Sequence, residues 1–210
     1  MEKLKEMILK GKTRETAEYV RELIDKGAAP GAILKEAMIP AMDEVGDLFG
    51  AGEYYVPEML ISAKAMQNGL EILKPILKQG DTELLGTVIV GTVKGDLHDI
   101  GKNLVVIALE GVGFKVIDLG TDVSPEKFIE AIREHKPAVV GLSALLTTTM
   151  RAMKVAIQSI EKAGLRDKVK IMVGGAPVNK EFSEQIGADF YALDSTAGRN
   201  YAREAVTGEA

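Results

Sequence analysis

The stretch Gly95–Asn103 (GDLHDIGKN) decides how the second half of the chain is read. It follows the apolar run Leu85–Val93 and precedes a second apolar run, Leu104–Leu109. A polar turn between two such runs predicts the link between a buried strand and a helix, which is where open α/β sheets bind their ligands. One of the two histidines, His98, lies in this turn. We therefore expect a ligand site there.

The sequence after residue 84 alternates short β-rich runs with helical patterns. The expected strands are Gly86–Gly91, Lys115–Leu119, Ala138–Leu142, Lys170–Val173 and Asp189–Ala192. The expected helices cover about 99–112, 124–134, 149–163, 178–186 and 196–206. Ser124-Pro125-Glu126 is typical of a helix start. This alternation predicts an α/β domain with a five-stranded parallel sheet, flavodoxin-like (Rossmann-like), in strand order 2-1-3-4-5 and with helices on both faces.

The first half of the chain has helical spacing instead. One apolar stripe consists of Met59, Ala63, Met66, Leu70 and Leu73. Such stripes predict a bundle of four or five short antiparallel helices, with Thr13 as an N-cap and a bend at Pro40. The polar, glycine-containing stretch Leu77–Leu84 predicts a linker. We expect a helical domain at 1–78, a linker at 79–84 and the α/β domain at 85–210.

Composition excludes several classes of function. The chain has 210 residues and no cysteine, which leaves no disulfide, zinc–thiolate cluster, iron–sulfur centre or cysteine nucleophile. Its net charge of −5 argues against a nucleic-acid partner. No apolar run reaches the length of a membrane span, and the first residues have no apolar signal core. We expect a cytoplasmic protein.

Three loops carry the candidate chemistry, because the ends of strands one, three and four converge in this fold. They are GDLHDIG (95–101), SALLTTT (143–149) and Gly174-Gly175-Ala176. Taken singly, each has an ordinary structural explanation as a helix cap or a turn. Together they predict a histidine whose Nδ1–H is held by a carboxylate, so that Nε2 points outward as a metal ligand. The other two loops would line a slot for something long and flat.

Other kinds of site fail on spacing. A P-loop requires glycine at Asp96 and serine or threonine at Asn103. A response regulator requires a phosphorylatable aspartate where Ser143 stands. A zinc enzyme requires three ligands, and the second histidine, His135, is expected on the surface at the opposite rim. A nucleophile–base pair would use Ser143 or a threonine with His98, without an evident oxyanion hole.

The order Asp96-x-His98-x-x-Gly101, Ser143-x-Leu145 and Gly174-Gly175 resembles the corrinoid-binding signature. GTVKGDLHDIGKN (91–103) is similar to the cobalamin domain of methionine synthase and of the small corrinoid proteins of methanogens and acetogens. VGDLFGAGEYYVPEMLISAKAM (45–66) resembles the helical cap domain that precedes that domain. The resemblance covers nearly the whole chain. It implies a cobalt corrinoid as cofactor: cobalamin or a related cobamide, and methylcobalamin in the loaded state.

The resemblance also implies roles for individual residues. His98 would be the axial cobalt ligand, Asp96 would hydrogen-bond it, and Thr149 would complete the relay where relatives carry serine. Phe49 and Val56 would cover the upper, methyl-bearing face, although relatives more often have a leucine-like residue at the second position. The other cofactor contacts implied are Gly95, Leu97, Asp99, Ile100 and Gly101, then Ser143, Leu145 and Thr147, then Gly174, Gly175 and Ala176, and finally Tyr191, Ala192 and Asp194 in a loop Tyr191–Asp194.

A member of this family would carry a methyl group on cobalt between a substrate:corrinoid methyltransferase and a second methyltransferase. It would be a non-catalytic carrier subunit with these two partners and a reductive activator, and without nucleic-acid or membrane partners. Two alternatives stay open. The corrinoid-binding subunit of an adenosylcobalamin-dependent mutase shares the signature but lacks such a cap. A corrinoid-dependent sensor would need a DNA-binding segment, and no basic recognition helix is evident. The methyl donor is not encoded in any of these motifs.

Overall fold

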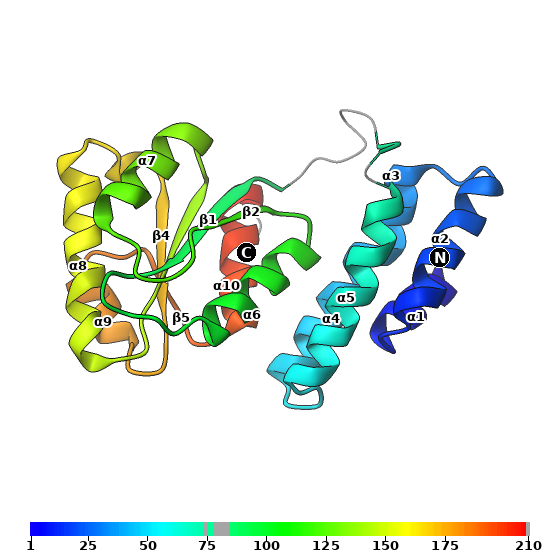
Figure 1. Cartoon of the computed structure of the whole chain (residues 1–210), viewed down its shortest axis with the longest axis horizontal. Helices are drawn as coiled ribbons and strands as arrows, with labels where there is room; N and C mark the ends of the chain where they lie inside the picture. The colour runs from blue at the N-terminus through cyan, green and yellow to red at the C-terminus, as the bar shows by residue number, and fades with distance from the viewer. Residues whose placement is uncertain (74, 78–84, 209–210) are drawn as a thin grey trace. The chain divides into compact units, whose positions relative to one another are not determined.

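The structure, a computed structural model, describes residues 1–73, 75–77 and 85–208 (Figure 1). The expected linker at 79–84 lies outside the described residues. The chain divides into two compact units. One comprises Met1–Leu84 with Gly111–Gly113, and the other Leu85–Glu110 with Phe114–Ala210.

The first unit is helical. Its elements are α1 (Glu2–Leu9), α2 (Thr13–Asp25), α3 (Pro30–Ile33), the π-helix η1 (Leu34–Met38), α4 (Ile39–Gly50) and α5 (Val56–Leu73). The core consists of fully buried apolar side chains that recur at helical spacing, among them Leu4, Ile8, Val20, Met38, Met59 and Leu73. Helices α2 and α5 pack along one another. Gly69 permits their close approach, because a Cβ there would lie 3.3 Å from Cγ2 of Thr16 and 3.4 Å from Cγ2 of Val20.

The expected bend at Pro40 takes the form of a widened helical turn. Proline has no N–H to donate to the carbonyl four residues earlier, and its ring crowds that carbonyl. Here the N–H of Ile39 bonds to the carbonyl of Leu34, five residues back, as in a π-helix. Helices α3, η1 and α4 therefore follow one another without a break.

The second unit is the expected α/β domain. Its strands are β1 (Thr87–Thr92), β2 (Lys115–Asp118), β3 (Val139–Ser143), β4 (Lys170–Gly174) and β5 (Phe190–Ala192). Its helices are α6 (Ile100–Gly111), α7 (Pro125–His135), α8 (Thr147–Lys162), the short 3₁₀ helix η2 (Arg166–Lys168), α9 (Lys180–Gln185) and α10 (Ser195–Thr207). All strand pairs are parallel, and the order β2-β1-β3-β4-β5 confirms the predicted order.

Both faces of the sheet are covered. Figure 1 shows α7 and α8 on one side and α6 and α10 on the other. The central strands are accordingly near-continuous apolar runs: residues 88–92 of β1 and 139–142 of β3 are all buried. Side chains of Ile89, Val140 and Ile171 join those of Phe128 and Ile157 in one core. This core fixes the strand ends, where the candidate site lies.

Three local expectations differ from the structure. Thr13 does not cap α2, because the carbonyl of Lys12 already accepts the N–H of Thr16, and Thr13 is therefore the first helical residue. Helix α8 begins at Thr147, two residues earlier than expected. The loop expected at Tyr191–Asp194 is shorter: Tyr191 and Ala192 pair with β4 as part of β5, as the expected strand Asp189–Ala192 already placed them, and only the last two residues of that range lie outside a strand.

No helix within the described ranges is both long enough and apolar enough to cross a membrane.

Candidate functional site

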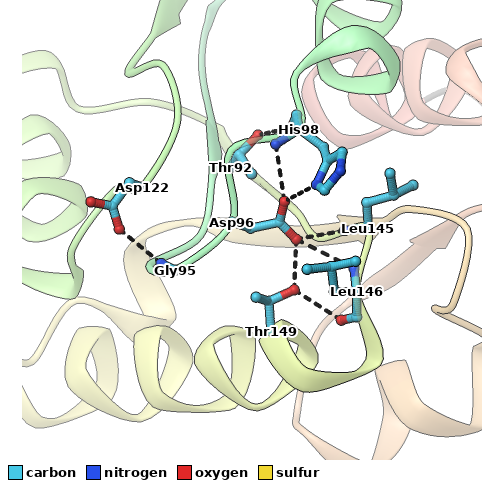
Figure 2. Close-up of polar contacts among 8 residues, drawn as sticks. All are labelled: Thr92, Gly95, Asp96, His98, Asp122, Leu145, Leu146 and Thr149. Carbon is cyan, nitrogen blue, oxygen red and sulfur yellow. Dashed lines mark hydrogen bonds and ion pairs between the residues drawn. The ribbon is translucent and has the colours of Figure 1, made fainter.

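The candidate site lies where β1, β2 and β3, three neighbouring strands, end at the carboxyl edge of the sheet. The chain order reverses between β1 and β3, and such a switch point is where doubly wound sheets bind ligands. The loop after β1 turns at Gly95, whose φ is +84°, and the N–H of Asp96 bonds back to the carbonyl of Val93 at 3.1 Å. The buried hydroxyl of Thr92 donates to the carbonyl of His98 at 2.9 Å (Figure 2).

Asp96 is the centre of the site, a carboxylate with no exposed surface. Its Oδ1 accepts hydrogen bonds from the backbone N–H of His98 at 3.0 Å and from Nδ1 of the same residue at 2.8 Å. Its Oδ2 accepts from the backbone N–H groups of Leu145 at 2.8 Å and Leu146 at 3.4 Å, and from the Thr149 hydroxyl at 2.6 Å (Figure 2). Residues after β1 and β3 are thereby joined through one side chain.

These hydrogen bonds determine the charge of Asp96. Burial alone would raise the pKa of its carboxyl. The donors, led by the Thr149 hydroxyl and the backbone N–H of His98, outweigh burial and hold the pKa well below its usual range. Asp96 is therefore ionised at neutral pH.

An ionised Asp96 sets the tautomer of His98. Because the carboxylate can only accept, the imidazole proton lies on Nδ1, and Nε2 carries a free lone pair. The imidazole side chain is 49% exposed. The site thus presents one oriented nitrogen, Nε2 of His98, whose lone pair can bind a metal outside the sheet.

Thr149 reaches Asp96 from the first turn of α8. Its side chain is buried, and its hydroxyl also lies 2.8 Å from the carbonyl oxygen of Leu146. A hydroxyl has one proton for these two acceptors, and the charged carboxylate is the stronger one. The early start of α8 places this hydroxyl under the loop after β1.

The surroundings of His98 are apolar and open. Leu97 is 73% exposed and Ile100 is 75% exposed, which is unusual for large apolar side chains. Leu145 and Leu146 after β3 are also exposed. At Gly101 an added Cβ would meet no described atom within 4 Å. An apolar, flat ligand could therefore lie against this loop without displacing protein atoms.

The glycine pair at the end of β4, Gly174 and Gly175, has a structural cause of its own. Gly175 has φ +128°, and a Cβ there would lie 1.9 Å from the carbonyl oxygen of Ala144. At Gly174 a Cβ would lie 3.0 Å from the carbonyl oxygen of Ala192. Close backbone approach between neighbouring strands accounts for both glycines, so their contact with a cofactor stays a prediction.

The remaining predicted residues occupy varied positions. Ser143 ends β3, and Thr147 and Ala176 are exposed at the same edge of the sheet. Asp99 accepts a hydrogen bond from Nδ2 of Asn103, and Asp194 caps α10 by accepting from the N–H of Ala197 at 2.7 Å. In the first unit, Phe49 lies on α4 and Val56 begins α5, and both are partly exposed.

Sequence reasoning missed three contacts of this site: the Thr92 hydroxyl, the Leu146 N–H and Asp122, whose carboxylate accepts from the N–H of Gly95 at 2.8 Å. The predicted strand order could have pointed to Asp122. Strands β1 and β2 are neighbours, so the loops that follow them lie close together.

Comparison with known proteins agrees with this geometry. Residues 86–198 match a family model described as "B12 binding domain", and residues 1–74 match a second model with the same description. The chain is 44% identical over 177 residues to trimethylamine corrinoid protein 2 of Methanosarcina mazei, covering 83% of this chain and 81% of that protein.

Two solved structures are similar along almost the whole chain. One is the methanol:cobalamin methyltransferase complex from Methanosarcina barkeri, with 31% identity, a TM-score of 0.88, and coverage of 98% of this chain and 79% of that one. The other is a cobalamin-binding protein from Desulfitobacterium hafniense, with 30% identity, a TM-score of 0.80 and coverage of 97% of both chains. The chain therefore belongs to the family of B12-binding corrinoid proteins, and its cofactor is a cobalt corrinoid.

Proposed function

We propose that this protein carries a methyl group on the cobalt of its corrinoid, from a substrate:corrinoid methyltransferase to a second methyltransferase. The observation that carries the proposal is the pair His98–Asp96, in which the buried carboxylate holds Nδ1 at 2.8 Å and leaves Nε2 free. The family supports it, because the relatives are named as corrinoid proteins for methylamines and one solved relative is a methyltransferase complex.

The residues present fit a corrinoid bound with histidine as its lower ligand. One imidazole nitrogen is available, and a metal that takes a single protein ligand must bring its other ligands with it, as cobalt in a corrin ring does. Exposed Leu97 and Ile100 offer apolar contact to such a ring, and the open space at Gly101 admits it. When bound, the corrinoid supplies a cobalt that accepts and later releases the methyl group.

In this proposal Nε2 of His98 would bind the cobalt, and residues at the ends of β3 and β4 would hold the nucleotide tail of the cofactor. The tail contacts would come from Ser143, Leu145, Thr147, Gly174, Gly175, Ala176, Tyr191, Ala192 and Asp194. The helical domain at 1–78 would act as a cap, with Phe49 and Val56 over the methyl-bearing face and 79–84 as the linker to the corrinoid domain at 85–210.

Asp96 and Thr149 would hold His98 in the orientation that cobalt binding requires. The ionised carboxylate of Asp96 accepts from Nδ1–H at 2.8 Å, so Nε2 would be the nitrogen that binds the metal. The Thr149 hydroxyl donates to the same carboxylate and lowers its pKa.

The partner methyltransferase, and not this chain, would select the methyl donor. Relatives are named for trimethylamine and dimethylamine, and the solved complex is named for methanol, so a small methylated amine or alcohol is the class of donor that we infer. A reductive activator and a cytoplasmic location, both expected from the sequence, are part of this proposal.

A methyl-transfer assay tests the proposal. The protein is loaded with hydroxocobalamin, reduced, and mixed in turn with methyltransferases specific for trimethylamine, dimethylamine and methanol, each with its substrate. We expect one of these pairs to convert the bound corrinoid to its methylated spectrum, and His98→Ala to lose most of this conversion. If no pair methylates a protein that binds the corrinoid stably, the carrier proposal is wrong.

A further inference from the structure

Asp122 has an unusual backbone conformation. It lies in the loop between β2 and α7 and has φ +53°, in the left-handed region. Among the residues described, the other non-glycine residue with positive φ is Lys136, which directly follows the last residue of α7. Helices often end in this way, so Lys136 has an ordinary explanation. Asp122 is at no helix end, and its conformation persists only if surrounding contacts hold it.

The contacts of Asp122 converge on three consecutive residues of the loop after β1. Its Oδ1 accepts from the N–H of Gly95 at 2.8 Å (Figure 2). Its own N–H donates to the carbonyl of Asp96 at 2.9 Å. Its Oδ2 lies 2.9 Å from Nζ of Lys94. Asp122 thus holds the backbone on both sides of the Gly95–Asp96 peptide.

The ion pair with Lys94 is the least important of these contacts. Its side chains are 59% and 42% exposed, and exposed ion pairs contribute little to a fixed geometry. The two hydrogen bonds to the backbone of Gly95 and Asp96 remain as the reason for the left-handed conformation. Aspartate tolerates that conformation better than most residues and also supplies the acceptor.

The position of the Gly95–Asp96 peptide determines the position of the Asp96 side chain. The carboxylate of Asp96 accepts five hydrogen bonds from the loops after β1 and β3 and from the first turn of α8, and their geometry depends on where its Cα lies. The bond from the N–H of Asp96 to the carbonyl of Val93 restrains one side of this residue, and the preceding glycine populates many backbone conformations. The contacts of Asp122 add the restraint at Gly95 and at the carbonyl of Asp96. A displaced Asp96 would release Nδ1 of His98.

We propose that Asp122 is a positioning residue for His98, acting through the backbone of Gly95 and Asp96. The inference rests on the proposed role of His98 as the cobalt ligand. Asp122 does not contact His98. It determines how firmly the imidazole of His98 is held in position. The loop after β2 thereby affects the fraction of protein in which His98 is bound to cobalt.

Two variants of Asp122 distinguish the effect of its hydrogen bond with Gly95 from the effects of its charge and of its backbone strain. Asp122→Gly keeps the left-handed conformation accessible but removes the acceptor for Gly95. Asp122→Asn keeps that acceptor and removes the charge. The matched control is Ser124→Ala, which removes the N-cap of α7 two residues away without touching the loop after β1.

The first measurement uses the full-length protein without cofactor. Hydrogen exchange of the His98 backbone N–H reports the Asp96–His98 contact, which Asp122 does not touch. We expect exchange about tenfold faster in Asp122→Gly, and within about twofold of wild type in Asp122→Asn and Ser124→Ala. Equal acceleration in Asp122→Gly and Ser124→Ala, or none in either, overturns the proposal. Acceleration in Asp122→Asn as large as in Asp122→Gly also overturns it, because charge would then be the cause.

The second measurement uses the protein produced with ¹⁵N-labelled histidine, loaded with hydroxocobalamin and reduced to the cobalt(II) state. Electron paramagnetic resonance gives the ratio of cobalt with a ¹⁵N ligand to cobalt without one. We expect this ratio to fall about fivefold to tenfold in Asp122→Gly and to stay near wild type in the other two variants. An unchanged ratio in Asp122→Gly contradicts the positioning role. If wild type itself shows no nitrogen ligand, the ligand role of His98 fails instead, and the two failures are distinguishable.

Discussion

At the scale of single residues, a buried carboxylate is costly unless hydrogen bonds replace its lost water. Asp96 has these bonds: backbone N–H groups, one hydroxyl and one imidazole saturate both of its oxygens. The result is a fixed negative charge 2.8 Å from Nδ1 of His98. That charge orients the imidazole through the hydrogen bond from Nδ1.

The Thr149 hydroxyl is the donor whose removal tests this arrangement with least disturbance. Thr149→Val keeps the shape but removes the proton that Oδ2 of Asp96 accepts at 2.6 Å. We expect the free energy of unfolding of the cofactor-free protein to fall by about 1–3 kcal/mol, because a buried charged group loses a partner. The pKa of Asp96 should rise as well, measured by carboxyl carbon NMR.

Thr149→Ser is the control, since it keeps the hydroxyl and loses one methyl group, worth about 1 kcal/mol or less. Equal pKa values of Asp96 in wild type and Thr149→Val would show that this hydroxyl does not support the carboxylate.

Sequence predicted the pair His98–Asp96 because its members are two residues apart in one loop. It placed Thr149 only through the family resemblance, since the hydroxyl comes from 53 residues further along the chain. Thr92 and Asp122 were missed because ordinary turn and strand residues carry no motif. Their contacts arise from tertiary neighbours that the local pattern does not name.

At the scale of elements, close approach of strand ends shapes the carboxyl edge of the sheet. Gly175 lies directly over the carbonyl of Ala144, so the loops after β3 and β4 touch through backbone atoms. Gly101, in the first turn of α6, has open space instead. The two glycines therefore make different predictions when each is changed to alanine.

Gly175→Ala should destabilise the fold strongly. The new methyl group would lie 1.9 Å from a carbonyl oxygen at a backbone φ of +128°, so strands β3 and β4 would have to separate. We expect a loss of roughly 2–4 kcal/mol in the free energy of unfolding, measured with urea on the cofactor-free protein. A variant as stable as wild type would mean that the two loops do not touch in this way.

Gly101→Ala should leave the fold intact and weaken cofactor binding. Alanine is a better helix former than glycine and meets no described atom, so the free energy of unfolding should be unchanged or up to about 1 kcal/mol higher. The affinity for hydroxocobalamin, measured by absorbance titration, should fall if the corrin ring lies over this residue. Unchanged affinity would place the ring elsewhere.

The last helix makes a prediction about alkaline pH. Tyr201 of α10 stacks on Phe190 of β5 with ring centroids 4.2 Å apart. Burial, reinforced by the carboxylate of Asp189, raises the pKa of Tyr201 to about 12. A pKa raised in the folded state means that the protonated phenol contributes stability that is fully present below about pH 10, the usual value, and is lost as the pH approaches 12.

We therefore expect wild type to lose more stability than Tyr201→Phe between pH 10 and pH 12. Urea unfolding of both proteins at several alkaline pH values measures this, and their difference cancels the other titrating groups. A difference in unfolding free energy that does not change with pH would contradict the burial of the phenol.

Element types could be predicted because periodicity is a property of local sequence. The strand order was expected only from the fold class that alternating strands and helices suggest. The last strand was expected at Asp189–Ala192 and is found at Phe190–Ala192, so its end was predicted as well. Helix starts were predicted less well. Thr13 carries a typical capping side chain, yet the helix already begins with the carbonyl of Lys12, so a backbone contact overrides the residue's own preference.

At the scale of the whole molecule, the groups that define the candidate site all belong to one unit. The donors to the Asp96 carboxylate lie between His98 and Thr149. The helical unit matches a separate B12-binding model and supplies the residues proposed for the other face of the cofactor. One part of the chain would thus supply the histidine that binds cobalt, and another part would shield the methyl group.

The central claim is that Nε2 of His98 binds the cobalt. The most direct measurement is electron paramagnetic resonance of the protein produced with ¹⁵N-labelled histidine, loaded with hydroxocobalamin and reduced to cobalt(II). We predict hyperfine splitting from a single ¹⁵N nucleus in wild type, and its loss in His98→Ala. A splitting pattern from unlabelled nitrogen, or the same spectrum in wild type and His98→Ala, would contradict the claim.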